Sequence, residues 1–235
     1  LHFPPTDFGK DNLLAEKIDP ASITVTGNTV IDALRLEAER QGDPAIARQI
    51  DDALAAELGA GWRDTPFVLV TGHRRENFGG GFAQICDALV ALADKYPGHN
   101  FIYPVHLNPN VQQPVYKKLG GRKNIKLIPP KDYRLFVALM KASHIVLTDS
   151  GGVQEEAPGL GKPVLVMRDT TERPEGVKAG TVQLIGANKD NIVRHVGELI
   201  DHASIYRKMA EAVNPYGDGH ASTRIVAAIR GYLGV

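Results

Sequence analysis

The sequence predicts an α/β fold, a doubly wound domain built on a parallel sheet. From residue 67 onward, short runs of β-branched and other apolar residues alternate with segments of helical length. The apolar runs are continuous rather than alternating, which is typical of parallel strands buried on both faces. Because strand, helix and strand follow one another through short links, we expect right-handed βαβ units in a single sheet.

Six strands and five intervening helices are expected. The strands are predicted at residues 67–71, 101–105, 125–128, 145–148, 164–167 and 182–185, and the helices between them at residues 82–96, 111–119, 133–142, 153–160 and 191–202. Together these elements make residues 66–213 a Rossmann-like domain.

The two ends of the chain fit this domain less well. In residues 1–65 we expect a strand at 23–26 and helices at 30–40 and 44–58. We interpret this segment as the tail of a preceding domain with its connector. Residues 214–235 are a turn-rich stretch followed by a final helix. The sequence does not begin with Met, and we expect it to be part of a longer protein.

Composition and missing motifs argue against several classes of function. The 27 basic and 27 acidic residues give a formal net charge of zero, so we expect no general nucleic-acid binding. No apolar run suits a transmembrane helix and no signal-peptide pattern is present, so we expect a cytoplasmic protein without membrane contact. Without a Walker A motif, a G-x-G-x-x-G motif or a Cys/His cluster, we expect no cofactor and no metal. The single cysteine, Cys86, falls in an apolar helical pattern and is expected to be a buried packing thiol.

The strongest motif directly follows the fourth predicted strand and contains Ser150, Gly151 and Gly152. Consecutive glycines let the backbone turn tightly and let a ligand approach the amides that open the next helix. Those amides and the positive end of the helix dipole can bind a diphosphate without a lysine. Glu156, one turn further on, can accept hydrogen bonds from ribose hydroxyls. The alternative is helix capping by Asp149 or Ser150 with no ligand, which would not require two glycines.

Other predicted strand ends also carry polar loops. The loop after the first strand contains His73 and Arg74, which can reach a phosphate oxygen. His106 follows the second strand, and the charged stretch 168–175 after the fifth can read a sugar. Phe136 follows the third strand, and packing on a base or in the core are equally good interpretations of it. These loops lie at the sheet edge where ligands bind in such folds.

Several long strings closely resemble the non-hydrolysing UDP-N-acetylglucosamine 2-epimerases. The resemblance covers nearly the whole chain and rests on residues 25–32, 71–77, 104–110, 148–156, 161–175 and 214–219. It implies a GT-B type two-domain architecture, with this chain as the C-terminal half and its last helix returning toward the N-terminal domain. It also implies interconversion of UDP-GlcNAc and UDP-ManNAc through elimination and re-addition of UDP, a role in surface polysaccharide synthesis, and a homodimer for the full-length enzyme.

The resemblance also implies roles for individual residues. Ser150, Gly151 and Gly152 would hold the diphosphate of the nucleotide sugar, and Glu156 would bind the ribose. His73 would contact the phosphate and stabilise the leaving UDP, which makes it the candidate catalytic residue.

Further residues are assigned by the same resemblance. The main chain of Lys131, a position where some members have Gln, would meet the uracil, and Phe136 would close that pocket. Arg173 matches a residue near the sugar and the phosphate. Arg74 and His106 lie where some members bind a second UDP-GlcNAc as an activator.

The family's first domain is not matched by this chain. That domain carries an arginine and a lysine near its start and the catalytic Asp and Glu residues. Because those carboxylates perform the proton chemistry at C2, we expect the chain to be inactive alone. A GT-B glycosyltransferase and a nucleotide-sugar-binding regulatory module are the alternatives, since fold alone does not fix chemistry. The strings at 71–77 and 168–175 favour the epimerase.

Overall fold

One six-stranded parallel sheet forms the centre of the molecule. The computed structural model describes residues 1–235, and its strands lie in the order β3-β2-β1-β4-β5-β6, each parallel to its neighbours. They are β1 (Phe67–Thr71), β2 (Asn100–Pro104), β3 (Ile125–Ile128), β4 (Ile145–Thr148), β5 (Val164–Val166) and β6 (Val182–Leu184). The predicted fold class is confirmed, and the predicted strands differ from the observed ones by one residue at the ends of β2, β5 and β6.

The chain reverses its direction of travel across the sheet at β1. It first builds β2 and β3 on one side of β1 and then returns to place β4 on the other side. β1 and β4 pair so that Thr71 lies beside Thr148 at their carboxyl ends. In open α/β sheets a crevice suited to ligands forms at this reversal, outside the carboxyl ends of the strands.

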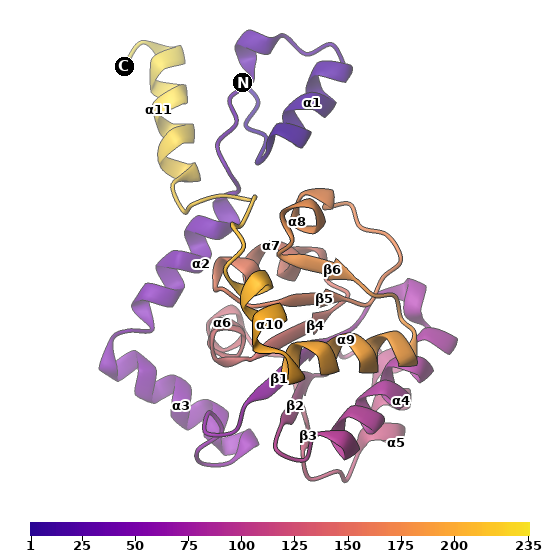
Figure 1. Cartoon of the computed structure of the whole chain (residues 1–235). Helices are drawn as coiled ribbons and strands as arrows, with labels where there is room; N and C mark the ends of the chain where they lie inside the picture. Colours follow the sequence, from indigo (N-terminus) through magenta and orange to yellow (C-terminus); the bar gives the residue numbers. More distant parts are fainter.

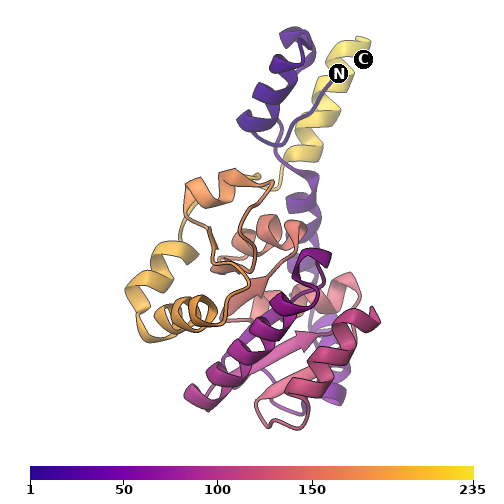
Figure 2. The same ribbon diagram turned by 90° about the vertical axis from the view of Figure 1, so that its right-hand side faces the viewer.

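Helices cover both faces of the sheet (Figures 1 and 2). The first face is packed by α4 (Gly80–Lys95), α5 (Pro109–Leu119) and α9 (Lys189–Asp201). The second face is packed by α2 (Thr29–Arg40), α3 (Pro44–Leu58), α6 (Tyr133–Ala142) and α7 (Gly151–Gly159). All of these helices match predicted ones, with ends that shift by no more than two residues. None of the helices has the length and apolar character needed to span a bilayer.

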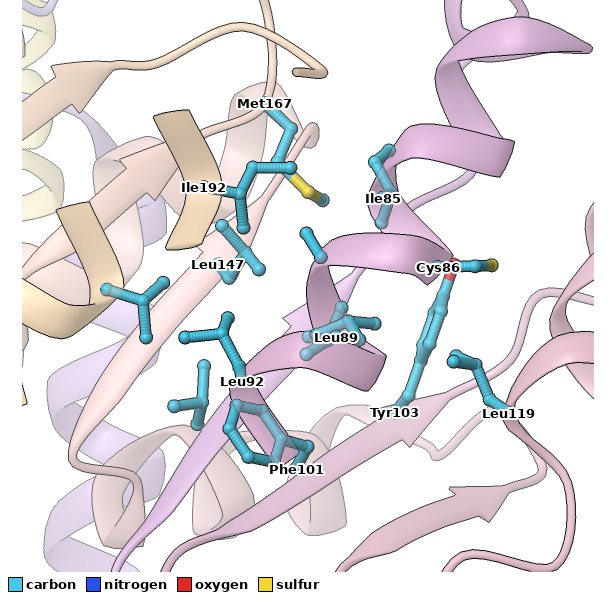
Figure 3. Close-up of a cluster of buried hydrophobic side chains, with 14 of the residues drawn as sticks. Ile85, Cys86, Leu89, Leu92, Phe101, Tyr103, Leu119, Leu147, Met167 and Ile192 are labelled. Carbon is cyan, nitrogen blue, oxygen red and sulfur yellow. The ribbon is translucent and has the colours of Figure 1, made fainter. Parts of the chain in front are cut away.

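The two-sided burial of the sheet explains its continuous apolar runs. Along β1, Val68 and Val70 belong to the hydrophobic cluster under α4 and α9, whereas Phe67 and Leu69 belong to the cluster on the opposite face. Successive side chains of a strand point to opposite faces, so both sets must be apolar. Figure 3 shows the first cluster, with Leu92 reaching from α4 toward the strands.

The single cysteine is a packing residue of the first cluster. Cys86 lies in α4, is fully buried and has no disulfide partner. Burial raises the pKa of its thiol to about 11. Because the thiolate is the nucleophilic form of cysteine, this side chain is inert near neutral pH. The predicted buried packing thiol is confirmed.

Residues 23–26 do not form a strand, so this prediction was wrong. They run beside the N-terminal residues and form one isolated bridge, between His2 and Ile23. The main-chain N–H of Thr24 donates to the carbonyl of His2 at 3.0 Å. The next donor of a parallel ladder would be the N–H of Pro4, which proline lacks. One hydrogen bond is therefore missing from the ladder, although the N–H of Thr26 still donates to the carbonyl of Pro4 at 3.2 Å, and no regular strand forms.

Three helices lie outside the sequence predictions: α1 (Asp7–Ala15), α8 (Pro174–Ala179) and α10 (Ala203–Ala210). Two of them have recognisable start signals. Thr6 caps α1 by accepting a hydrogen bond from the N–H of Gly9 at 3.2 Å, and Pro174 occupies the first position of α8. α1 has only weak apolar periodicity, and α8 and α10 span six and eight residues, too few for a period to be read with certainty from the sequence.

The two ends of the chain come together where they leave the sheet (Figures 1 and 2). The main-chain N–H of Asn28 donates to the carbonyl of Tyr216 at 2.7 Å. At Gly27, whose φ is +87°, a Cβ would lie 3.2 Å from the Cα of Gly217. Glycine is therefore required for both the backbone conformation and the close approach. From this crossing, α1 and α11 (Ala221–Leu233) extend away from the sheet.

These two outlying helices bury little of their apolar surface. No residue of α1 is buried, and Ala221 is the one buried residue of α11. Phe8, Val226 and Tyr232 are exposed. By contrast, α2 and α3 contribute to the core of the second face. The division of the chain into 1–65, 66–213 and 214–235 stays a prediction.

Two histidines lie at the opposite end of the sheet, where strands begin. His99 precedes β2 and His144 precedes β4, and their ring centroids are 6.1 Å apart. His144 also packs on Tyr206, with centroids 4.4 Å apart. Burial lowers the pKa of both imidazoles, and at His144 the neighbouring charges of His99 and Lys162 lower it further. Asp201 partly opposes the shift at His99.

We predict that acid destabilises the fold through these histidines. Between the lowered folded pKa and the ordinary value of about 6.5, the unfolded state binds more protons. This contribution to stability is therefore present above about pH 6.5 and is lost as the pH falls below it. His144→Phe keeps a ring against Tyr206 and should reduce the loss, measured as urea midpoints at about pH 7.5 and about pH 5.5. The exposed control His202→Phe should behave as wild type; a His144→Phe midpoint that falls as steeply as wild type would contradict this account.

Candidate functional site

A cavity of about 320 Å³ opens at the carboxyl ends of the strands. Loops after β1, β2 and β3 and the first turn of α7 enclose it. Most of the predicted site residues line it, namely His73, His106, Lys131, Phe136, Ser150, Gly152 and Glu156. A larger cavity, of about 520 Å³, lies at the crossing of the chain ends and contains none of them. The predicted residues therefore converge at the reversal of strand order, as the fold requires.

The first turn of α7 has no capping side chain. Ser150 is the N-cap residue, yet its hydroxyl makes no hydrogen bond to the helix, and the carboxylate of Asp149 is engaged elsewhere. No hydrogen bond occupies the main-chain N–H of Gly151 or Gly152. Helix capping, the alternative interpretation of this motif, does not account for its residues. The free amides and the helix dipole leave a site suited to an anion.

The two glycines have different surroundings. A Cβ on Gly151 would lie 3.2 Å from Cζ of Arg173, so glycine there permits the guanidinium to approach the helix. A Cβ on Gly152 would meet only the carboxylate of Glu156, at 4.0 Å, and Gly152 is exposed at the cavity. Gly152 therefore leaves space for a ligand rather than for the protein itself.

The loop after β1 is anchored to β4 by Asp149. This fully buried carboxylate accepts hydrogen bonds from the main-chain N–H of His73 and of Arg74, both at 2.9 Å. The ring of His73 stacks on that of His106, with centroids 5.5 Å apart and planes inclined by 18°. Sequence reasoning considered Asp149 only as a helix cap and missed this role. An acidic residue at a strand end was the sole local signal.

The opposite wall of the cavity holds Glu156. Burial raises the pKa of this carboxyl group, while a hydrogen bond from the hydroxyl of Tyr133, at 3.0 Å, opposes the shift. Tyr133 lies between the predicted residues Lys131 and Phe136, but sequence reasoning gave it no role of its own. The side chain of Lys131 pairs with Glu57 of α3. Lys131 therefore presents its main chain, rather than a free ammonium group, to a ligand.

The remaining predicted residues, Gly151, Arg74 and Arg173, lie outside the cavity lining. Both arginines pair with Glu172, Arg74 at 3.2 Å and Arg173 at 3.0 Å, and Arg168 joins them at 2.8 Å. Although burial acts in the opposite direction, hydrogen bonds from its own main chain and from Arg168 lower the pKa of Glu172 to about 2. Ion pairs thus order the charged loop 168–175 beside the first turn of α7.

No group of three or more His, Cys, Asp or Glu side chains is arranged to hold a metal ion. The cavity itself offers free amides, two stacked imidazoles and one buried carboxyl group. Such a set suits a ligand that combines an anionic group with hydroxyls.

Comparison with known proteins assigns the family. The model of the UDP-N-acetylglucosamine 2-epimerases matches residues 1–230. This chain belongs to the UDP-N-acetylglucosamine 2-epimerase family. A probable UDP-N-acetylglucosamine 2-epimerase of Ralstonia nicotianae is 53% identical over 234 residues, which are 99% of this chain and 61% of that protein. The resemblance predicted from the sequence is confirmed.

Solved structures of the epimerase family match the fold closely. The crystal structure of the UDP-GlcNAc 2-epimerase of Neisseria meningitidis bound to UDP-GlcNAc has a TM-score of 0.91 at 48% identity. The match covers 97% of this chain and 60% of that one, so the chain spans about three fifths of its relative. The C-terminal domain of a group 1 glycosyl transferase from Francisella tularensis matches 69% of this chain with a TM-score of 0.50 at 17% identity. The latter likeness concerns the fold alone, and it agrees with the predicted GT-B type architecture.

Proposed function

We propose that this chain is the UDP-binding part of an enzyme that interconverts UDP-GlcNAc and UDP-ManNAc. The observation that carries the proposal is the uncapped first turn of α7, whose free amides open at a cavity lined by the predicted residues. The membership of the epimerase family supports the identity of the ligand, and the Neisseria meningitidis relative is described as bound to UDP-GlcNAc.

The proposed pose places the diphosphate at the start of α7. Its oxygens accept hydrogen bonds from the amides of Gly151 and Gly152 and from the hydroxyl of Ser150, with help from the helix dipole. Glu156 accepts hydrogen bonds from the ribose hydroxyls. The uracil lies beyond the ribose, where the residues at the start of α6 and the loop before it line the cavity.

Two residues complete the base pocket. Lys131 supports it through its main chain, because its side chain is held by Glu57. Phe136 lines the cavity and offers a ring face to the uracil. Arg173, whose guanidinium lies over Gly151, acts on the phosphate side of the ligand rather than at the base.

His73 is the proposed catalytic residue. When the C2 proton is removed and the C1–O bond breaks, the electron pair of that bond goes to a phosphate oxygen of the departing UDP. A donor fixed at that oxygen stabilises the developing charge. His73 lines the cavity beside Ser150 and Gly152 and is the histidine anchored to β4 through Asp149. In the re-addition, a phosphate oxygen of UDP bonds to C1 and a proton returns to C2 on the opposite face, which inverts the configuration at C2.

The groups that move the C2 proton are proposed to lie on the part of the enzyme that this chain does not span. Glu156 is the one carboxylate lining the cavity, and the ribose engages it. About two fifths of the length of the relatives remains for the catalytic carboxylates. That part would pack on the exposed apolar side chains of α1 and α11. The homodimer of the complete enzyme and the activating site near Arg74 and His106 stay predictions.

We predict that Gly152→Val abolishes UDP binding. The branched side chain would fill the space in front of the first turn of α7, where nothing else lies within 4 Å except the carboxylate of Glu156. Isothermal titration calorimetry of the chain with UDP measures the effect. Gly231→Val, in an open position of α11, is the matched control and should bind UDP as wild type does. An unchanged affinity of Gly152→Val would place the phosphates elsewhere.

We also predict that the chain binds UDP-GlcNAc without converting it. Proton NMR of the mixture should show broadened UDP signals and no UDP-ManNAc or 2-acetamidoglucal, because the C2 proton has no base to receive it. Steady formation of UDP-ManNAc would show that these 235 residues carry their own proton-transfer groups.

A further inference from the structure

Asp149 is surrounded by hydrogen-bond donors. Its side chain has no solvent-exposed surface. Both of its oxygens accept from the main-chain N–H of His73, at 2.9 and 3.1 Å, and one of them also accepts from the N–H of Arg74 at 2.9 Å and from Nδ2 of Asn77 at 3.2 Å. Because every partner donates, the group acts as an acceptor-only carboxylate. These hydrogen bonds fix the main chain of the loop, but none of them involves the imidazole ring of His73.

The imidazole of His73 faces the same carboxylate. Its Nδ1 lies 3.3 Å from Oδ1 of Asp149, which no solvent reaches. An unprotonated Nδ1 would set its lone pair against a buried carboxylate oxygen, whereas an Nδ1–H is attracted to that oxygen. We propose that Asp149 is a positioning residue that keeps a proton on Nδ1 of His73 and leaves Nε2 to face the departing phosphate. This inference rests on the proposed function.

The neighbouring ring provides a contrast within the same cavity. His106 stacks on His73, but its Nδ1 accepts a hydrogen bond from the main-chain N–H of Asn108 at 3.1 Å. A nitrogen that accepts a bond carries no proton, so neutral His106 has its proton on Nε2. The two stacked imidazoles therefore carry opposite tautomers when neutral, and each is set by a separate partner.

The fixed Nδ1 proton has a consequence for the reaction. With its Nδ1 protonated beside the carboxylate of Asp149, His73 can donate to a phosphate oxygen only through Nε2, and only as the imidazolium cation. The cation would balance the charge left on UDP when the C1–O bond breaks. If the ring rotated by half a turn to offer Nδ1 to the phosphate, it would lose its contact with Asp149, the residue that follows β4. Asp149 itself touches no substrate atom in this arrangement.

The test is a tautomer measurement on the intact chain with UDP. Nitrogen-15 NMR of labelled histidines, recorded above the titration range of the rings, should show His73 with its proton on Nδ1 and His106 with its proton on Nε2. In Asp149→Asn, His73 should revert to the Nε2–H form that imidazole prefers in water, and UDP affinity should fall roughly tenfold, the lower end of the loss seen when the partner that orients a metal-bound histidine is removed. Asp132→Asn is the matched control, because Asn also caps α6, and it should change neither property.

The outcomes separate this inference from the proposed function. Absence of UDP binding to the wild-type chain would overturn the proposed function. UDP binding with the proton of His73 on Nε2 would overturn the positioning role alone, and this spectrum needs no variant to fold. A folded Asp149→Asn chain that keeps His73 in the Nδ1–H form would also contradict it.

Discussion

The candidate site depends on the hydrogen bonds that the carboxylate of Asp149 accepts from the main chain of His73 and Arg74. Asp149 directly precedes Ser150, the N-cap residue of α7, and a carboxylate that capped this helix would occupy an amide of its first turn. Here the carboxylate accepts from the loop after β1 instead, so the amides of Gly151 and Gly152 stay free while His73 is drawn to the same edge. One buried group thus both opens the anion site and brings the imidazole to it.

This arrangement is possible because β1 and β4 are neighbours in the sheet. Their carboxyl ends are paired at Thr71 and Thr148, whose hydroxyls are hydrogen-bonded, so the loops that follow start side by side. Any strand order that separated β1 from β4 would carry His73 away from α7. Both central strands are buried on their two faces, so apolar packing holds the ends from which these loops start.

Much of the fold, and part of the site, could be predicted from local patterns. Continuous apolar runs located all six strands, and the string around Ser150 located the first turn of α7. The predictions that failed, and the roles that were missed, depend on contacts between residues far apart in the sequence. The segment 23–26 lacks one ladder hydrogen bond because its partner segment contains Pro4, and the role of Asp149 depends on donors 72 to 76 positions away in sequence. Tyr133 likewise belongs to the site because its hydroxyl donates to Glu156, a contact that no local sequence pattern indicates.

The central claim is that the diphosphate of UDP lies against the first turn of α7. A crystal structure of this chain with UDP tests it most directly. We predict phosphate oxygens within hydrogen-bond distance of the amides of Gly151 and Gly152, with the uracil against Phe136. UDP found in the larger cavity at the crossing of the chain ends, beside Arg35 and Arg224, would contradict the account.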